Sequence, residues 1–235
     1  MSEASSPGAN TALSGRRLWY PQSRGLSALE FLLGASIVIG HNVYHVVPNE
    51  VPILFVLGWI SVRLRDGGWK ALGLTRPKSR TWTVGIALAA AALRHLMGEF
   101  VIDPLAARLL HRAPEVAEFN ALTGNLKLAL LGLLVVWTFA AFGEELSYRG
   151  YLLTRAADLG HRSVAAYWIG MICVSVLFGF GHHSRGWSGV VDSGMAGVIL
   201  GGAYLLSRRN LWVPILAHGF IDTFAVIVVF FGWQF

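Results

Sequence analysis

The sequence predicts an all-α fold, a polytopic membrane helix bundle of seven or eight transmembrane segments. Of its 235 residues, 54% are hydrophobic and only 14% are charged, whereas soluble domains are about 25% charged. The chain also contains 27 Gly and 9 Trp residues, which suit close helix packing and anchoring at the membrane interface. An ordinary water-exposed surface is excluded, so we expect an integral multi-pass membrane protein surrounded by a lipid bilayer.

Apolar segments long enough to form membrane helices recur along the chain. The fourth segment is too long for one crossing, because 126–156 would measure about 46 Å as a single α-helix. The second segment is the weakest, because its apolar core covers only 51–62 and a ~30 Å hydrocarbon layer needs about 20 helical residues. The seven segments lie at about 26–46, 48–63, 82–103, 126–156, 163–181, 189–207 and 211–232.

The distribution of Lys and Arg supports seven crossings. If every segment crosses the membrane, fourteen of the 19 Lys and Arg residues share the side of the amino terminus. Four lie on the other side, and Arg94 falls within a segment. Because positively charged connections stay in the cytoplasm, we expect a cytoplasmic amino terminus, with the plasma membrane as the location.

The chain divides into two parts by composition. Residues 1–25 are polar and are expected to form a flexible cytoplasmic tail, followed by a single membrane domain at 26–235. The net charge of +6 belongs to the short connections rather than to a basic face with interleaved aromatic residues. The sequence therefore does not predict nucleic-acid binding.

Charged residues interrupt the fourth apolar segment. Glu144 and Glu145 follow an uninterrupted apolar run, and Arg149 comes four residues after Glu145. A charged side chain near the centre of a membrane helix costs about 2.5–3.5 kcal/mol on insertion scales, so these residues need an explanation. Glu145 and Arg149 lie on one helix face and can neutralise each other, which leaves Glu144 without a local cation.

Two later segments carry polar residues at similar depths. Measured from the cytoplasmic helix ends at 1.5 Å per residue, Glu144 and Asp222 lie about 18 Å deep, and His218 about 12 Å. His182 comes out at about 28 Å, a difference that helix tilt and a break at 179–181 could absorb. Because ionisable residues inside a membrane are usually functional, we expect one shared buried site.

Structural explanations also exist for single members of this set and for other polar or small residues. Glu145 and Arg149 could form a purely structural pair, and Glu144 could contact water at the interface. Arg94 lies near His95 and Glu99 in the third segment, where we expect an interhelical pair. The spacing of Gly197 and Gly201 is typical of a helix-packing face.

Three motifs in this order resemble the CAAX protease and bacteriocin-processing family of intramembrane endopeptidases. They are EExxxR from Glu144 to Arg149, FxxxH from Phe178 to His182, and HxxxD from His218 to Asp222. The resemblance covers about 126–230, where a catalytic core is expected. It implies an endopeptidase that hydrolyses a peptide bond of a membrane-associated or prenylated-type substrate in the inner half of the membrane.

The resemblance also implies roles for the residues of the first two motifs. Glu144 would be the general base that activates a water molecule, and His182 would help to hold that water. Glu145 and Arg149 would fix the helix and orient Glu144. Phe178 would support the site as part of its motif.

The third motif would stabilise the oxyanion of the tetrahedral intermediate. In this chain Asp222 stands where the family more often has Asn, so we expect Asp222 to accept a hydrogen bond from His218 and to orient its ring. The residues also permit a zinc site formed by Glu144, His182 and His218. The chain has no HExxH motif, and we therefore expect no cofactor. A non-enzymatic transporter or maturation partner is the rival class, but transporters often show internal repeats and none is evident here.

Overall fold

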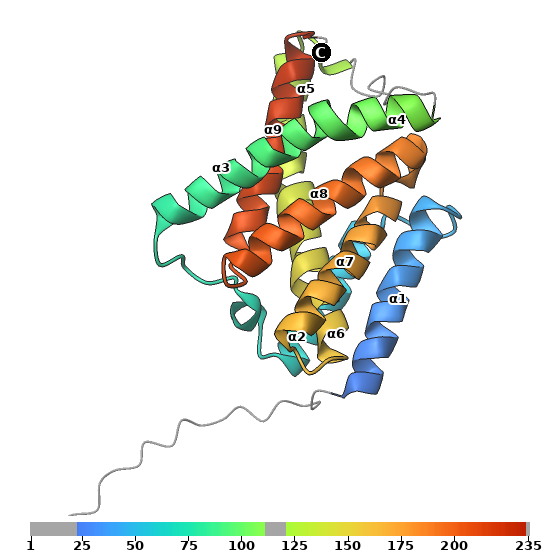
Figure 1. Cartoon of the computed structure of the whole chain (residues 1–235), viewed down its shortest axis with the longest axis vertical. Helices are drawn as coiled ribbons and strands as arrows, with labels where there is room; N and C mark the ends of the chain where they lie inside the picture. The colour runs from blue at the N-terminus through green and yellow to red at the C-terminus, as the bar shows by residue number, and fades with distance from the viewer. Residues whose placement is uncertain (1–22, 111–120, 234–235) are drawn as a thin grey trace, which may run out of the picture.

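The computed structural model describes residues 23–110 and 121–233, and within these ranges it is helical without any β-strand. Each of the seven predicted apolar segments contains a helix (Figure 1). Residues 1–22 of the expected tail lie outside the described residues, and the first helix already begins at Arg24. The main helices are α1 (Arg24–Asn42), α2 (Glu50–Arg65), α3 (Arg80–Met97), α4 (Asp103–Leu110), α5 (Leu126–Val135), α6 (Leu153–Asp158), α7 (Val164–Phe180), α8 (Gly186–Leu206) and α9 (Trp212–Phe230).

Several of these helices have the length and composition of membrane spans. In the described part of the chain, five helical stretches are at least 18 residues long and apolar enough to cross a bilayer. α7 is equally apolar but has only 17 residues, and α2 has 16 and contains charges at both ends. The structure is therefore an integral membrane helix bundle. The five stretches are Arg24–Asn42, Arg80–Leu105, Leu126–Asp158, His183–Leu206 and Trp212–Phe230.

The long central helix departs from regular α geometry where the sequence places its charges. Between α5 and α6 it adopts two π-helical stretches, η4 (Val136–Glu144) and η5 (Leu146–Leu152). The π-helix forms i→i+5 hydrogen bonds, is rare, and occurs frequently at functional sites. The adjacent glutamates Glu144 and Glu145 lie at the junction of the two stretches, a feature that hydrophobic periodicity does not predict.

Small residues allow α7 and α8 to lie side by side, as Figure 1 shows. A Cβ atom added at Gly197 would lie 3.0 Å from Ser175, and one added at Gly201 would lie 2.6 Å from Met171. The expected packing role of the two glycines is thus confirmed. The predicted interhelical pair is also present, because Arg94 on α3 donates to Asp192 on α8 at 2.6 Å.

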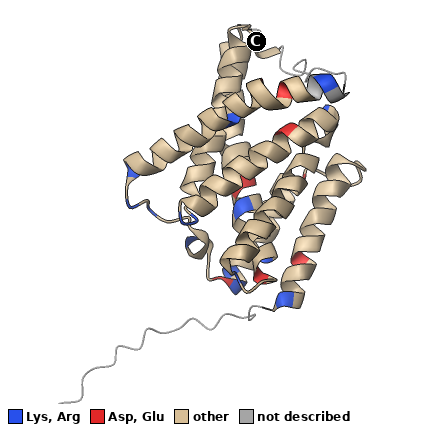
Figure 2. Cartoon of the chain, viewed as in Figure 1, with Lys and Arg blue, Asp and Glu red and all other residues tan. Residues whose placement is uncertain are grey.

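Most basic residues of the described chain gather at one end of the bundle (Figure 2). This end contains the start of α1, the ends of α2 and α6, and the turn between α8 and α9. The clustering is the pattern expected of a cytoplasmic face. The direction in which the chain crosses the membrane remains a prediction from the sequence.

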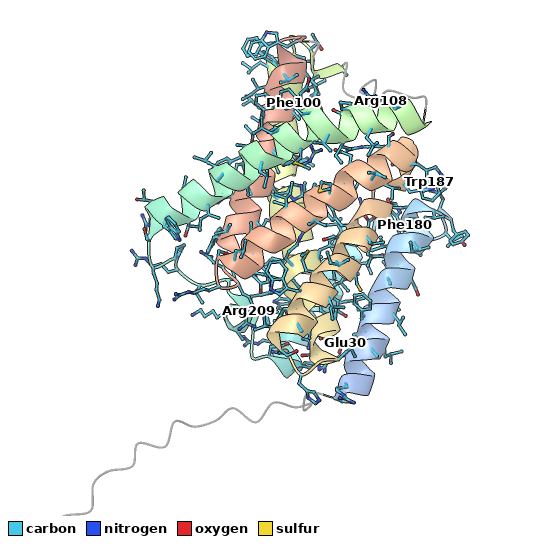
Figure 3. The ribbon with its side chains drawn as sticks, in the orientation of Figure 1. Glu30, Phe100, Arg108, Phe180, Trp187 and Arg209 are labelled. Carbon is cyan, nitrogen blue, oxygen red and sulfur yellow. The ribbon has the colours of Figure 1, made fainter. Side chains whose placement is uncertain are left out.

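A buried network of ion pairs joins α1, α2 and α6 at this basic end. Arg155 is fully buried and donates to Asp158 at 2.8 Å and to Asp66 just beyond α2. Arg65 donates to Glu30 of α1 at 2.8 Å, and Glu30 is labelled beside these helices in Figure 3. Because a buried charge that loses its partner is costly, the network fixes the end of the central helix against α1 and α2.

A prediction about this packing concerns Gly179 near the end of α7. The substitution Gly179→Ala would place a methyl group 2.4 Å from the carbonyl oxygen of Val190 on α8. Overpacking of this kind costs roughly 1–3 kcal/mol, so we expect a lower melting temperature for the purified protein in detergent. Gly202→Ala is the matched control, because nothing lies within 4 Å of its added Cβ. Equal melting temperatures for the two variants would contradict the packing.

Candidate active site

The predicted polar residues converge on one cavity of about 300 Å³. Glu144 lines it from the end of η4, His182 from just beyond α7, and His218 and Asp222 from α9. In Figure 1 the central helix runs beside α9, and η4 packs against α9. The expectation of one shared site is thereby met in the geometry, although the four residues span 79 positions of the sequence, from 144 to 222. The rest of the lining is Leu122, Val136, Ala140, Arg185, Ala225, Val226 and Val229.

Glu144 and Glu145 are adjacent in sequence but occupy different environments. Glu144 lines the cavity, and its Oε2 atom is buried without a hydrogen-bond partner among the described residues. Glu145 does not line the cavity and is completely buried. Its Oε2 atom also has no partner, but its Oε1 atom accepts two hydrogen bonds. Of the two adjacent glutamates, only Glu144 therefore presents its carboxylate to the cavity.

The carboxylate of Glu145 joins two helices. Arg149 on the same helix donates to Oε1 at 2.8 Å, as the four-residue spacing predicted. His218 on α9 contacts the same oxygen through Nδ1, also at 2.8 Å. Since a carboxylate oxygen only accepts, Nδ1 of His218 carries the proton. The Glu145–Arg149 pair is thus more than a local neutralisation, because it also orients a residue of the site.

Phe178 forms the wall behind these side chains. The guanidinium of Arg149 lies 4.4 Å from the centre of its ring, within the range of a cation–π contact. The rings of Tyr148 and His182 each lie 5.0 Å from it, and that of His218 lies at 6.1 Å. Phe178 therefore packs against members of all three motifs and limits the positions that their side chains can take.

His182 reaches the cavity because α7 ends before it. The helix stops at Phe180 and is capped by Gly181, which is the break that the depth difference required. Nδ1 of His182 lies 3.1 Å from the carbonyl oxygen of Phe178. A carbonyl oxygen can only accept, so Nδ1 is the donor, and in the neutral ring Nε2 is left as an acceptor.

Asp222 occupies a different position relative to His218 from the one the motif suggested. We expected Asp222 to orient the ring, but Glu145 makes the 2.8 Å contact with Nδ1. Oδ2 of Asp222 lies 3.5 Å from Nε2, the other ring nitrogen, and its side chain is 30% exposed. His218 is therefore flanked by a carboxylate on each side, and the orienting role passes to Glu145.

Arg185 is a lining residue that the sequence reasoning missed. It ends the short 3-10 turn η6 (His183–Arg185), which precedes α8. The sequence did contain a signal for this position, because Arg185 comes three residues after His182. On a tight turn that spacing returns a side chain to the same side.

The zinc alternative would need a compact group of ligating side chains. Among residues 23–110 and 121–233, no three His, Cys, Asp or Glu side chains are grouped so that they could hold a metal ion. The set that zinc would need, Glu144, His182 and His218, lines one cavity but is not gathered as a ligand shell.

Ionisable groups buried within a membrane helix bundle usually mark a functional site. Residues 126–224 match the family model described as Type II CAAX prenyl endopeptidase Rce1-like. No curated protein and no solved structure matches the chain. The match confirms the resemblance to the CAAX protease family, and the region that carries all three motifs is Rce1-like. In general terms, it supports a membrane-embedded protease that acts on peptide or protein substrates.

The Glu145 contacts lead to a prediction about stability. Glu145→Gln would leave the guanidinium of Arg149, which is 1% exposed, without its carboxylate. Breaking a buried pair in this way typically costs about 3–5 kcal/mol, so we expect a markedly lower melting temperature in detergent. Glu99→Gln serves as the control, because Glu99 is exposed and forms no ion pair with a described residue. A Glu145→Gln protein as stable as the control would show that Arg149 does not depend on this carboxylate.

Proposed function

We propose that this protein is an intramembrane endopeptidase in which Glu144 activates the attacking water. The observation that carries the proposal is the position of Glu144, whose carboxylate lines the cavity together with His182, His218 and Asp222. The substrate would be a membrane-associated or prenylated-type peptide or protein. Apolar side chains of the same cavity, among them Val136 and Val226, suit the apolar part of such a substrate.

The chemistry follows from the groups that face the cavity. Glu144 accepts a proton from water while the water oxygen bonds to the carbonyl carbon of the peptide, which places a negative charge on the carbonyl oxygen. The C–N bond then breaks as the proton passes from Glu144 to the leaving nitrogen. The carboxylate of Glu144 is thereby restored, and an acid and an amine are released.

Each histidine has a separate task in this scheme. Because Nδ1 of His182 faces the Phe178 carbonyl, its Nε2 atom can accept a hydrogen bond from the attacking water. His218 is held at Nδ1 by Glu145, so Nε2 is the atom that can donate to the oxyanion. Such donation requires protons on both ring nitrogens, and the carboxylate of Asp222 at 3.5 Å would stabilise that charge.

We also propose where the reaction takes place. The basic end of the bundle would lie on the cytoplasmic side of the plasma membrane, with the amino terminus there and the cleavage site in the inner half of the bilayer. The clustering of Lys and Arg in Figure 2 supports this orientation.

The first prediction from this mechanism concerns Glu144→Gln. The amide keeps the shape of the side chain but cannot accept the proton of the water, so we expect turnover of a membrane-associated peptide to fall by about 10²–10⁴-fold. The melting temperature should stay unchanged, since Glu144 makes no ion pair with a described residue. Glu99→Gln should retain full turnover. Wild-type activity in well-folded Glu144→Gln would exclude Glu144 as the base.

A second prediction separates this mechanism from the zinc alternative. Protein purified in an active state should contain no stoichiometric zinc by elemental analysis, and phenanthroline should leave its turnover unchanged. Zinc that tracks with activity, and that is lost in both His182→Ala and His218→Ala, would instead establish a metalloprotease. In that event, Glu144, His182 and His218 would be the ligands.

A further inference from the structure

A second cavity, of about 500 Å³, lies at the basic end of the bundle where the chain enters α3 and where α8 turns into α9. It shares no lining residue with the cavity of Glu144. Residues 75–79 form one wall, and residues 206–208 form the other. Thr83 and Val213 are buried and line the cavity between these walls, so the depression is closed on the side of the bundle.

The polar lining of this cavity is cationic. Arg76 and Lys78 contribute to one wall and Arg208 to the other, and no acidic residue lines the cavity. All three are exposed, and none forms an ion pair with a residue that the structure describes. Three positive charges around one depression create a site for an anion. Groups able to donate further hydrogen bonds are Thr75, Ser79 and Asn210.

Hydrogen bonds between residues that flank the two walls hold the walls in place. The backbone N–H of Leu211 donates to the carbonyl of Gly73 at 3.2 Å, and the side-chain amide of Asn210 donates to Thr83 at 3.2 Å. Gly73 has φ +100°, and a Cβ there would lie 1.7 Å from the carbonyl oxygen of Arg209. The close approach of the two segments therefore requires glycine, and the site is preorganised, which lowers the entropic cost of binding.

Two consecutive arginines at the turn between α8 and α9 have different partners. Arg209, labelled in Figure 3, donates to the hydroxyl of Tyr167 on α7 at 2.6 Å and lies 4.8 Å from the centre of its ring. Arg208 makes no such contact and lines the cavity. The membrane topology places both arginines on the same side and does not distinguish them. Only the folded structure shows that Arg208 lines the cavity.

Apolar side chains beside the cations distinguish a lipid from a soluble anion. Trp82 and Leu206 line the same cavity, although they are 71% and 76% exposed. In a membrane protein such side chains face the bilayer, and Trp is favoured at the interface between acyl chains and headgroups. Free phosphate would use only the cations, whereas a phospholipid would also contact Trp82 and Leu206.

We propose that this cavity binds the phosphate headgroup of an anionic glycerophospholipid. The phosphate lies between Arg76, Lys78 and Arg208, and the first methylene groups of the acyl chains lie along Trp82 and Leu206. The bound lipid connects the start of α3 to the start of α9, the helix that contains His218. This inference does not depend on the proposed peptidase activity.

The test is the retention of lipid by the purified full chain in detergent, measured by native mass spectrometry during titration with phosphatidylglycerol or phosphatidylcholine. We expect phosphatidylglycerol to bind preferentially. We also expect Lys78→Gln/Arg208→Gln to weaken its binding by about 10-fold or more, given that each cation near an anionic lipid surface contributes substantially. Arg63→Gln/Lys70→Gln is the matched control, because it removes one Arg and one Lys from the same end of the bundle but outside the cavity.

Three results would overturn the proposal. Equal losses in the two double variants would mean a diffuse electrostatic effect without a site. Equal retention of both lipids would remove the role of the headgroup charge. Inorganic phosphate that displaces phosphatidylglycerol at a similar concentration would identify a site for soluble anions. The double variant Lys78→Gln/Arg208→Gln could be less stable than the wild type in the absence of lipid. In that case the single variants Arg76→Gln, in the cavity, and Arg63→Gln, outside it, are compared instead.

Discussion

The hydrogen bonds from Arg149 and His218 to one oxygen of Glu145 set the relation between the central helix and α9. All three side chains are buried, so bulk water cannot replace a lost partner. Hydrogen bonds between ionised groups are shorter and roughly twice as strong as neutral ones, and they are also directional. The ring of His218 is therefore held at a defined angle, and its second nitrogen faces the cavity that Glu144 lines.

The backbone around this contact is adapted to it. The central helix is π-helical on both sides of Glu145, and α9 approaches it closely through Gly219, where an added Cβ would lie 2.5 Å from the ring of Trp137. The indole N–H of Trp137 donates to Thr223 on α9 at 3.1 Å. A bulkier residue at 219 would push α9 away and lengthen the Glu145–His218 contact. Packing and hydrogen bonding thus support the same arrangement.

Three groups of polar side chains in this apolar bundle have different partners. In the cavity that Glu144 lines, one oxygen of its carboxylate has no partner among the described residues, which suits the proposed role as a base. In the network between α1, α2 and α6, the charges of Arg155 and Asp66 are buried against each other, which suits a structural role. In the cavity beside α3, cations are exposed without carboxylates, which suits an external anion. The pairing of the charges, rather than their number, distinguishes these roles.

The sequence by itself determined the helical class, the positions of the seven apolar segments and the contacts that lie within one helix. Apolar runs of about 20 residues have the length of a membrane span, and residues four apart lie on one face of a helix. This reasoning predicted the pair of Glu145 with Arg149, and the three motifs indicated the family. Tertiary structure alone decided that Glu145, rather than Asp222, orients His218. Glu145 and His218 are 73 positions apart in the sequence, so only the packing of their helices brings them together. Tertiary structure also decided that Arg208 and Arg209 have different partners, since this outcome depends on how whole helices pack.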